Sequence, residues 1–250
     1  MVKNLVVTCT STSGKCFELN GSYGFWAENI IYNASNTGFT TQGLLFYTSS
    51  NARHRHHNLS YRGSHGTGAR ALYFAGSVID VQAKNLEVTN SKFNQMSHGT
   101  STPMKYCNFH FSLVDGVASL FYLSHTGLYG VIHTIDLMTN CGGGFRQDPG
   151  GTNDELAKCV FKFGVVNGAG SGQFSFIGYD NIVDLGINDS TGTIKLEQQS
   201  GSGNPVNMLM GGVLECGSLS VDGTVVISGA VSYPSGSLSG VPGQNNGHDK

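Results

Sequence analysis

The chain has 250 residues, of which only 12% are charged, and its formal net charge at pH 7 is −2. Nucleic-acid binding needs a clustered basic surface, and the sequence has no long basic run, so we exclude that class. No window approaches the roughly 18 consecutive apolar residues of a membrane span, so we expect no membrane insertion.

The first predicted strand is the apolar run Leu5–Val7, which ends at Thr8 and the small residue Cys9. This opening stretch is too short for a signal peptide. The same pattern, an apolar run closed by a polar or small residue, recurs along the chain at intervals of 21 to 29 residues. We call the residues that close these runs the markers: Thr8, Asn33, Arg62, Asn90, Asp115, Asn140, Asn167 and Asn188.

Repeats of 20 to 50 residues indicate a solenoid, a propeller or an array. The near absence of helical patterns excludes helical solenoids, and propeller blades need about 40 residues or more. Roughly 25 residues hold three short strands, and Asn, Asp and Gly accept the left-handed backbone of a tight corner. The sequence therefore predicts an all-β, right-handed parallel β-helix in which Asn33, Asn90, Asn140 and Asn167 lie one above another. A second series, Asn4, Asn29 and Asn58, opens the runs, with Asn85 displaced by one residue.

The segment Arg53–His57, continuing to Arg62, is His/Arg-rich and is expected to be an insertion at a corner. Arg53, His56, His57 and Arg62 are candidate substrate-binding residues, since they offer a base and a charge neutraliser for a uronic acid. Adjacent histidines point to opposite sides of a strand, so only His54 and His56 share a face. No nearby carboxylate completes a metal site, and we expect neither a metal nor a cofactor. An ordinary polar loop stays an open alternative.

A second insertion is expected over residues 142–155, which are rich in glycine. Glycoside hydrolysis uses two carboxylates, and the densest acidic group lies here. Asp148, Asp154 and Glu155 are the candidate catalytic residues, with Arg146 placed to orient a sugar carboxylate. The alternative is a solvated loop in which Asp154 and Glu155 begin a short helix.

Three other aspartates lie in or beside apolar strands. Asp115 occupies a marker position, where Asp makes the same corner as Asn. Asp136 and Asp184 each precede a marker by four residues and lie two coils apart, so the rise per coil predicts a separation of about 9–10 Å. This distance lies at the upper limit for the two carboxylates of an inverting glycosidase.

Aromatic and sulfur-containing residues complete the candidates. Trp26 is the only tryptophan and either stacks on a sugar or fills the interior or a subunit interface. The six cysteines form no C-x-x-C pair, so we expect free buried thiols in a reducing compartment.

The chain divides into three expected parts. Residues 1–190 form the β-helix coils, and residues 191–231 form a small C-terminal β region for capping or trimerisation. Residues 232–250 are rich in Gly, Ser, Pro and Asn and are expected to be a flexible tail.

Asn-cornered coils, a Ser/Thr/Asn/Gly surface and a C-terminal strand cluster, over about residues 4–230, resemble tailspikes of tailed bacteriophages. Pectinase-like proteins share the coil, and no specific motif is matched. The resemblance implies a homotrimer in the tail appendage of a virion, made in the host cytoplasm, that binds bacterial surface polysaccharide such as capsule, O-antigen or exopolysaccharide. It leaves three functions open: a receptor-binding protein, a depolymerase (hydrolase or lyase), or a structural spike without a glycan site.

Overall fold

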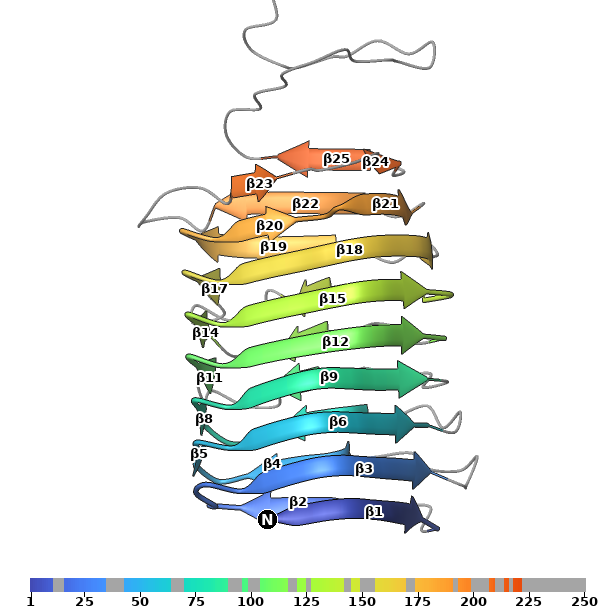
Figure 1. Ribbon diagram of the computed structural model, residues 1–250. Coiled ribbons are helices and arrows are strands. Elements are labelled where there is room, and N and C mark those ends of the chain that lie inside the picture. The colour runs from blue at the N-terminus through green and yellow to red at the C-terminus, as the bar shows by residue number, and fades with distance from the viewer. Residues whose placement is uncertain are drawn as a thin grey trace, which may run out of the picture.

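The computed structural model contains only β-strands among the residues it describes. These residues are 1–10, 16–34, 43–63, 70–89, 96–98, 104–116, 121–124, 127–141, 145–148, 156–169, 174–190, 193–198, 207–209, 214–215 and 218–221. The strands stack as a solenoid, and Figure 1 shows the chain climbing from the N-terminus in a right-handed path. The predicted all-β parallel β-helix is confirmed. Within the described ranges no helix is long and apolar enough to cross a membrane.

One face of every coil belongs to an 11-stranded sheet, which we call the front sheet. Its strands are β1 (Val2–Cys9), β3 (Trp26–Ala34), β6 (Arg55–Arg62), β9 (Gln82–Thr89), β12 (Asn108–Asp115), β15 (Ile132–Thr139), β18 (Val160–Ala169), β20 (Ile182–Asp184), β21 (Ile187–Ser190), β23 (Asn207–Leu209) and β24 (Leu214–Glu215).

The other two faces form a 14-stranded sheet. The second face holds β2 (Phe17–Asn20), β4 (Gly43–Thr48), β7 (Arg70–Phe74), β10 (Met96–His98), β13 (Phe121–Ser124), β16 (Phe145–Asp148), β19 (Phe174–Tyr179), β22 (Thr193–Gln198) and β25 (Ser218–Val221). The third face holds β5 (Asn51–Ala52), β8 (Val78–Ile79), β11 (Met104–Lys105), β14 (Leu128–Tyr129) and β17 (Leu156–Ala157).

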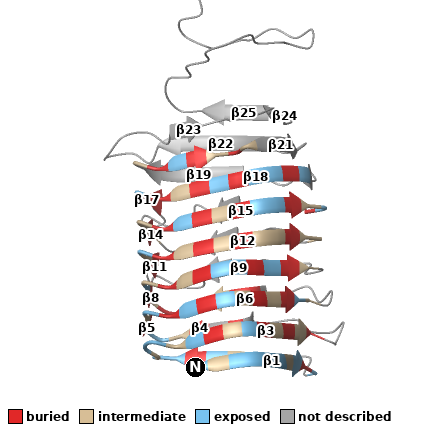
Figure 2. Ribbon diagram, viewed as in Figure 1, coloured by how far each residue is buried: buried red, intermediate tan, exposed pale blue. Residues whose placement is uncertain are grey.

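Side chains alternate between the interior and the solvent along each front-sheet strand, as Figure 2 shows. In β3, Ala27, Ile30 and Tyr32 point inward and are almost completely buried. Because the strands pair in parallel register, like side chains stack from coil to coil. Tyr32 lies on Tyr61 with ring centroids 5.2 Å apart and an interplanar angle of 7°. These stacked interior columns are the core of the solenoid.

The asparagines that open the runs form a continuous ladder over the first four coils. Asn29 donates its Nδ2 to Oδ1 of Asn4 at 2.8 Å, Asn58 donates to Asn29 at 2.9 Å, and Asn85 donates to Asn58 at 2.7 Å. All four have left-handed backbone angles, with φ between 53° and 57°. The predicted displacement of Asn85 is therefore wrong, because Leu86 pairs in register with Leu59 and places Asn85 on Asn58.

The predicted column of markers is confirmed in part. Thr8, Asn33 and Arg62 are in register. The next partners along the column are Thr89, Asp115, Thr139, Asn167 and Asp189. Asn140 and Asn188 thus lie one residue away from the predicted alignment. Asn90 lies outside the described residues, and Thr89, which precedes it, occupies the place in the marker column expected for Asn90. Asn140 is displaced because it is the left-handed corner residue after β15, with φ 53°.

The most regular corner precedes the front sheet, and its residue types are mixed. From β3 to β20, the described residues include one with positive φ at this corner of each coil: Gly24, Arg53, Asp80, Tyr106, Gly130, Lys158 and Asp180. Backbone hydrogen bonds join this column from coil to coil, such as Asp80 N to Lys105 O at 3.0 Å and Tyr106 N to Tyr129 O at 3.0 Å. The main corner of the solenoid is thus fixed by backbone bonding and does not select Asn.

Two expected insertions are instead partly built into the coils. Most of the His/Arg-rich stretch is the strand β6 and the corner before it. Part of the Gly-rich stretch is β16, and the end of the expected short helix is β17 followed by the left-handed residue Lys158. Parallel pairing with neighbouring coils outweighs the weak local helix preference. Residues 153–155 lie outside the described ranges.

The five described cysteines form no disulfide, and the predicted burial is confirmed for four of them: Cys9, Cys107, Cys141 and Cys159, whereas Cys16 is half-buried. Burial raises the pKa of Cys107 and Cys159 to about 12. Parallel pairing also continues past residue 190, because β22 adds to β19 and β25 adds to β22. The role of residues 191–231 in capping or trimerisation stays a prediction, and residues 232–250 lie outside the described ranges.

Candidate functional site: a groove on the outer face of the front sheet

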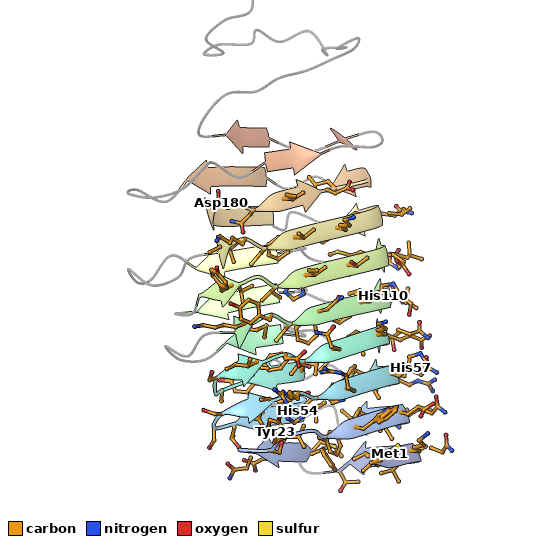
Figure 3. All side chains as sticks on the ribbon, turned by 60° about the vertical axis from the view of Figure 1, so that its left-hand side comes forward. Met1, Tyr23, His54, His57, His110 and Asp180 are labelled. Atoms are coloured by element: carbon orange, nitrogen blue, oxygen red, sulfur yellow. The ribbon has the colours of Figure 1, made fainter. Side chains whose placement is uncertain are left out.

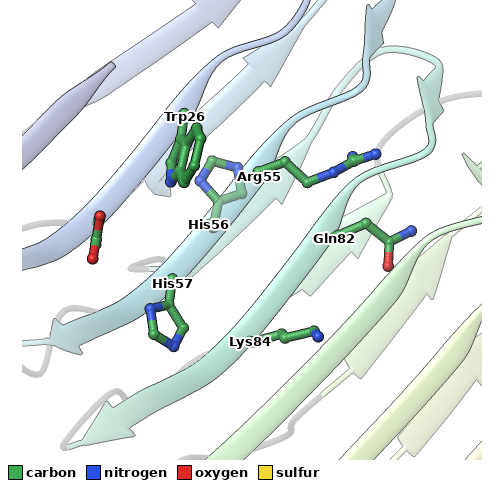
Figure 4. Close-up of a pocket in the computed structure, with 7 residues that line it drawn as sticks. Trp26, Arg55, His56, His57, Gln82 and Lys84 are labelled. Atoms are coloured by element: carbon green, nitrogen blue, oxygen red, sulfur yellow. The ribbon is translucent and has the colours of Figure 1, made fainter.

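A shallow groove of about 290 Å³ lies on the outer face of the first coils, across β3, β6 and β9 (Figure 4). It is lined by Trp26, Glu28, Arg55, His56, His57, Gln82 and Lys84. We call it the Trp26 groove.

Register explains why these residues meet. Trp26, Arg55 and Gln82 are paired positions in one outward column. Glu28, His57 and Lys84 are paired positions in the next outward column. Residues paired in this way are separated by about 4.8 Å per coil, so residues from three coils form one continuous surface.

Trp26 supplies the apolar part of the groove. Trp26 is the only tryptophan of the chain and is 49% exposed. Lys3 Nζ lies 5.8 Å from the ring centroid, within the range of a cation–π contact. Trp26 therefore offers a large aromatic surface to a ligand, and the ammonium group of Lys3 lies next to that surface.

Both acidic side chains near the groove are already neutralised. Glu28 pairs with Lys3 at 2.6 Å, and the hydrogen bond from Lys3 is the main reason that the pKa of Glu28 is lowered. Asp80 pairs with Arg55 at 3.1 Å. Burial alone would raise the pKa of Asp80, but the hydrogen bonds from Arg55 and Gln82 outweigh it, so the pKa is lowered. The acids near the groove are thus held as carboxylates in ion pairs.

Lys84 is not balanced in the same way. Among the described residues, Lys84 forms no hydrogen bond or ion pair with an acidic side chain, whereas His57 lies beside Glu28 and, after Lys3, contributes to lowering the pKa of Glu28. Figure 4 shows both on the same side of the groove, away from Arg55. The groove therefore combines an aromatic face, an amide and cationic side chains, a set that can stack on a sugar ring and bind its polar substituents.

His57 is the predicted substrate-binding residue that lies in this groove with its side chain outward. Figure 3 shows His57 on the front sheet, at a distance from the corner that holds Tyr23 and His54. Arg53 lies at that corner, with its guanidinium carbon 5.2 Å from the centroid of the Tyr23 ring. Arg62 ends β6, and its Nε donates to Ser60 Oγ at 3.3 Å. Of these three exposed candidates, the structure places only His57 in the Trp26 groove.

His56 borders the groove but its side chain lies inside the solenoid. It is 3% exposed, and its Nε2 is hydrogen-bonded to the hydroxyl of Tyr47. Burial, with a smaller contribution from the neighbouring His54, lowers the pKa of His56 to about 3. The prediction that His54 and His56 share a face is confirmed, and that face is the interior, out of reach of a ligand on the surface.

Among the candidate catalytic residues, only Asp148 lies within the described ranges. Arg146 and Asp148 belong to β16 on the second face, where they pair with Tyr122 and Ser124 of β13. Asp154 and Glu155 lie outside the described residues. Their catalytic role stays a prediction.

The other aspartates have local partners. Asp115 holds the predicted marker position and accepts a hydrogen bond from Asn140 Nδ2 at 3.0 Å. Asp136 pairs with His110 Nε2 at 2.9 Å on the outer surface. Asp184 pairs in register with Lys162 and caps the Gly186 amide at 3.1 Å.

The predicted alignment of Asp136 with Asp184 is wrong. Lys162 is in register with Thr134, so Asp184 belongs to the column of Thr134 and not to that of Asp136. Within the described ranges no three His, Cys, Asp or Glu side chains are grouped so as to hold a metal ion.

Sequence reasoning missed Glu28, Gln82 and Lys84 as site residues. They are ordinary polar side chains that lie 27 or 29 residues from their register partners Arg55 and His57, and only exact register shows that they adjoin Trp26 and His57. The left-handed corner residues Gly24, Arg53 and Asp80 give that register. The column of Trp26 lies two residues after them, and the column of Glu28 lies four residues after them.

Comparisons of the chain with protein-family models, with curated proteins and with solved structures give no match. The fold and the geometry of the groove therefore carry the functional argument.

Proposed function

We propose that this chain is a receptor-binding protein of the tailspike type, which recognises a bacterial surface polysaccharide through the outer face of its β-helix. The observation that carries the proposal is the half-exposed Trp26 in a groove lined by charged and amide side chains. Sugars are bound by stacking on aromatic rings and by hydrogen bonds to planar polar groups. A rigid stack of coils holds these side chains in fixed positions, which lowers the ordering cost of binding an extended polymer.

Self-association is the second part of the proposal. Farther along the front sheet, two outward columns are apolar: Ile132, Val160 and Ile182 form one, and Leu113, Leu137 and Val165 form the other. Ile132, Leu137, Val165 and Ile182 are each 37% to 39% exposed. Purely parallel sheets are generally covered on both faces, which supports packing of this surface against other copies of the chain, as a homotrimer.

Intrinsic fluorescence tests glycan binding directly. Because Trp26 is the only tryptophan, its emission reports on the groove alone. Titration with purified capsule, O-antigen and exopolysaccharide fragments is expected to change the Trp26 emission in a saturable way for at least one glycan. Calorimetry with a Trp26→Ala variant is expected to show at least about tenfold weaker binding, whereas Tyr106→Ala, which removes an exposed aromatic from the corner column, is the matched control.

The same samples distinguish the other functions. Release of new reducing ends, or of unsaturated products, from a bound glycan would favour a depolymerase. Absence of binding across the whole glycan panel would contradict the proposal and favour a structural spike.

A further inference from the structure

We infer that the ligand of the Trp26 groove is an acidic polysaccharide, in which a sugar ring stacks on Trp26 and its carboxylate is bound by Lys84 and His57. This inference rests on the proposed function and specifies the chemical class of its ligand.

The first step is the charge of the groove. Lys3 neutralises Glu28 at 2.6 Å, and Arg55 and Asp80 neutralise each other at 3.1 Å. Lys84 is then left as a cation without an acidic partner among the described residues. A groove whose acids are already paired and whose remaining cation faces solvent favours an anionic ligand.

The second step is the relative position of the two binding groups. His57 and Lys84 are paired residues of neighbouring strands, on the same outward face. Two donors on neighbouring strands about 4.8 Å apart can bind the two oxygens of one carboxylate. Hydrogen bonds to such a charged group are roughly twice as strong as neutral ones.

The third step is the position of Trp26 relative to these donors. Trp26 lies in the adjacent column, with Arg55 and Gln82 above it. Arg55 is held by its bonds to Asp80, with Nη1 donating to the Asp80 carbonyl at 2.8 Å and Nη2 to its carboxylate. Arg55 is therefore held at Asp80, away from Lys84 and His57 (Figure 4), and a sugar on Trp26 can extend its carboxylate toward Lys84 and His57.

Matched pairs of ligands separate this inference from the proposed function. Each uronic-acid-containing capsule or O-antigen fragment is compared with its own carboxyl-reduced, neutral form, by Trp26 fluorescence and by calorimetry. We expect carboxyl reduction to weaken binding at least about tenfold, and binding of the acidic form to weaken with rising salt.

Matched variants locate the effect. Lys84→Gln and His57→Gln are each expected to weaken binding of the acidic form about five- to twentyfold and to weaken binding of the reduced form by a much smaller factor. Lys162→Gln removes an exposed lysine from the same face farther along the sheet and is expected to change neither.

Each outcome has one meaning. Equal binding of the acidic and reduced forms, or binding of neutral glycans only, would overturn the acidic ligand but leave glycan recognition standing. A preference for the acidic form that Lys84→Gln and His57→Gln do not change would overturn the assigned residues. No binding to any acidic or neutral glycan would overturn both this inference and the proposed function.

Discussion

Asn58 lies directly on Asn29, donating its Nδ2 to the Asn29 Oδ1 at 2.9 Å, and both residues adopt the left-handed conformation. The same contact repeats on either side, with Asn4 and Asn85. A left-handed backbone is costly for most residues, but Asn adopts it more readily than others. The side-chain amide then forms hydrogen bonds with the asparagines of the neighbouring coils. One residue type therefore both adopts the left-handed backbone and joins successive coils.

Substitution of the central Asn tests this double role. Asn58→Ala is expected to lower the free energy of unfolding by about 2 to 3 kcal/mol, since it removes two hydrogen bonds and places at positive φ a residue that adopts this conformation less readily than Asn. Asn58→Gly also removes the two hydrogen bonds, but glycine adopts positive φ without strain, so the free energy of unfolding is expected to fall by only about 1 kcal/mol. Urea titrations of both variants measure the difference. Equal losses for Ala and Gly would show that the left-handed backbone contributes nothing.

Gly76 illustrates a different constraint, the close approach of two backbones. A Cβ built on Gly76 would lie 1.8 Å from the carbonyl oxygen of Ser49. Gly76→Ala is therefore expected to destabilise the protein by roughly 2 to 4 kcal/mol, because the coils must separate. Gly24→Ala is the control: its φ is 71° but no atom lies within 4 Å, so we expect a loss of only about 1 kcal/mol in the same urea titration. A similar loss for both variants would contradict the argument from close approach.

His56 makes stability depend on pH. Its folded-state pKa is about 3 and its ordinary value is 6.5, because burial disfavours the charged ring. Above pH 6.5 the ring is neutral in both states and stability is at its full value. As pH falls from 6.5 toward 3, the unfolded chain takes up a proton that the folded chain does not, so stability is lost at up to about 1.4 kcal/mol per pH unit.

Urea unfolding midpoints between pH 7 and pH 4.5 measure this loss. Wild type is expected to lose about 2 to 3 kcal/mol from His56 over this interval, and the burial of His54 acts in the same direction. His56→Gln, which retains a hydrogen-bonding group for Tyr47, is expected to be less stable at pH 7 but to lose less on acidification. Parallel losses in wild type and His56→Gln would exclude this residue as a source of the pH dependence.

The coil could be predicted from sequence because interior stacking imposes a near-regular period. Asn33 and Asn167 fall in the marker column as expected, whereas Thr89 and Thr139 hold the places expected for Asn90 and Asn140. The reason is that register is set by buried pairs such as Leu59 and Leu86. The identity of the residue at the strand end does not determine it, so a pattern built on Asn can shift by one position.

The site was less accessible to sequence reasoning for the same reason. The sequence marked His57 for its neighbours in the chain and Trp26 for its uniqueness, but it did not join them. Lys84 is 58 residues from Trp26 and meets it only because β9 lies one coil beyond β6. Surface columns carry no periodic signal, since each outward position tolerates many residue types, and they become visible only when the number of residues in each coil is known.

The apolar columns of the front sheet give the last prediction, which concerns assembly. Leu137 is 39% exposed and lies between Leu113 and Val165 in one of these columns. If this surface packs against other copies, Leu137→Glu places a charge in an apolar interface, at a cost large enough to separate the subunits. Light scattering is expected to give a trimer mass for wild type and a monomer mass for Leu137→Glu, with unchanged β-sheet circular dichroism.

Ile79→Glu is the matched control, because Ile79 is an apolar residue 42% exposed on the third face, away from these columns. A trimer that survives Leu137→Glu would place the interface elsewhere, and a monomeric wild type would remove it altogether.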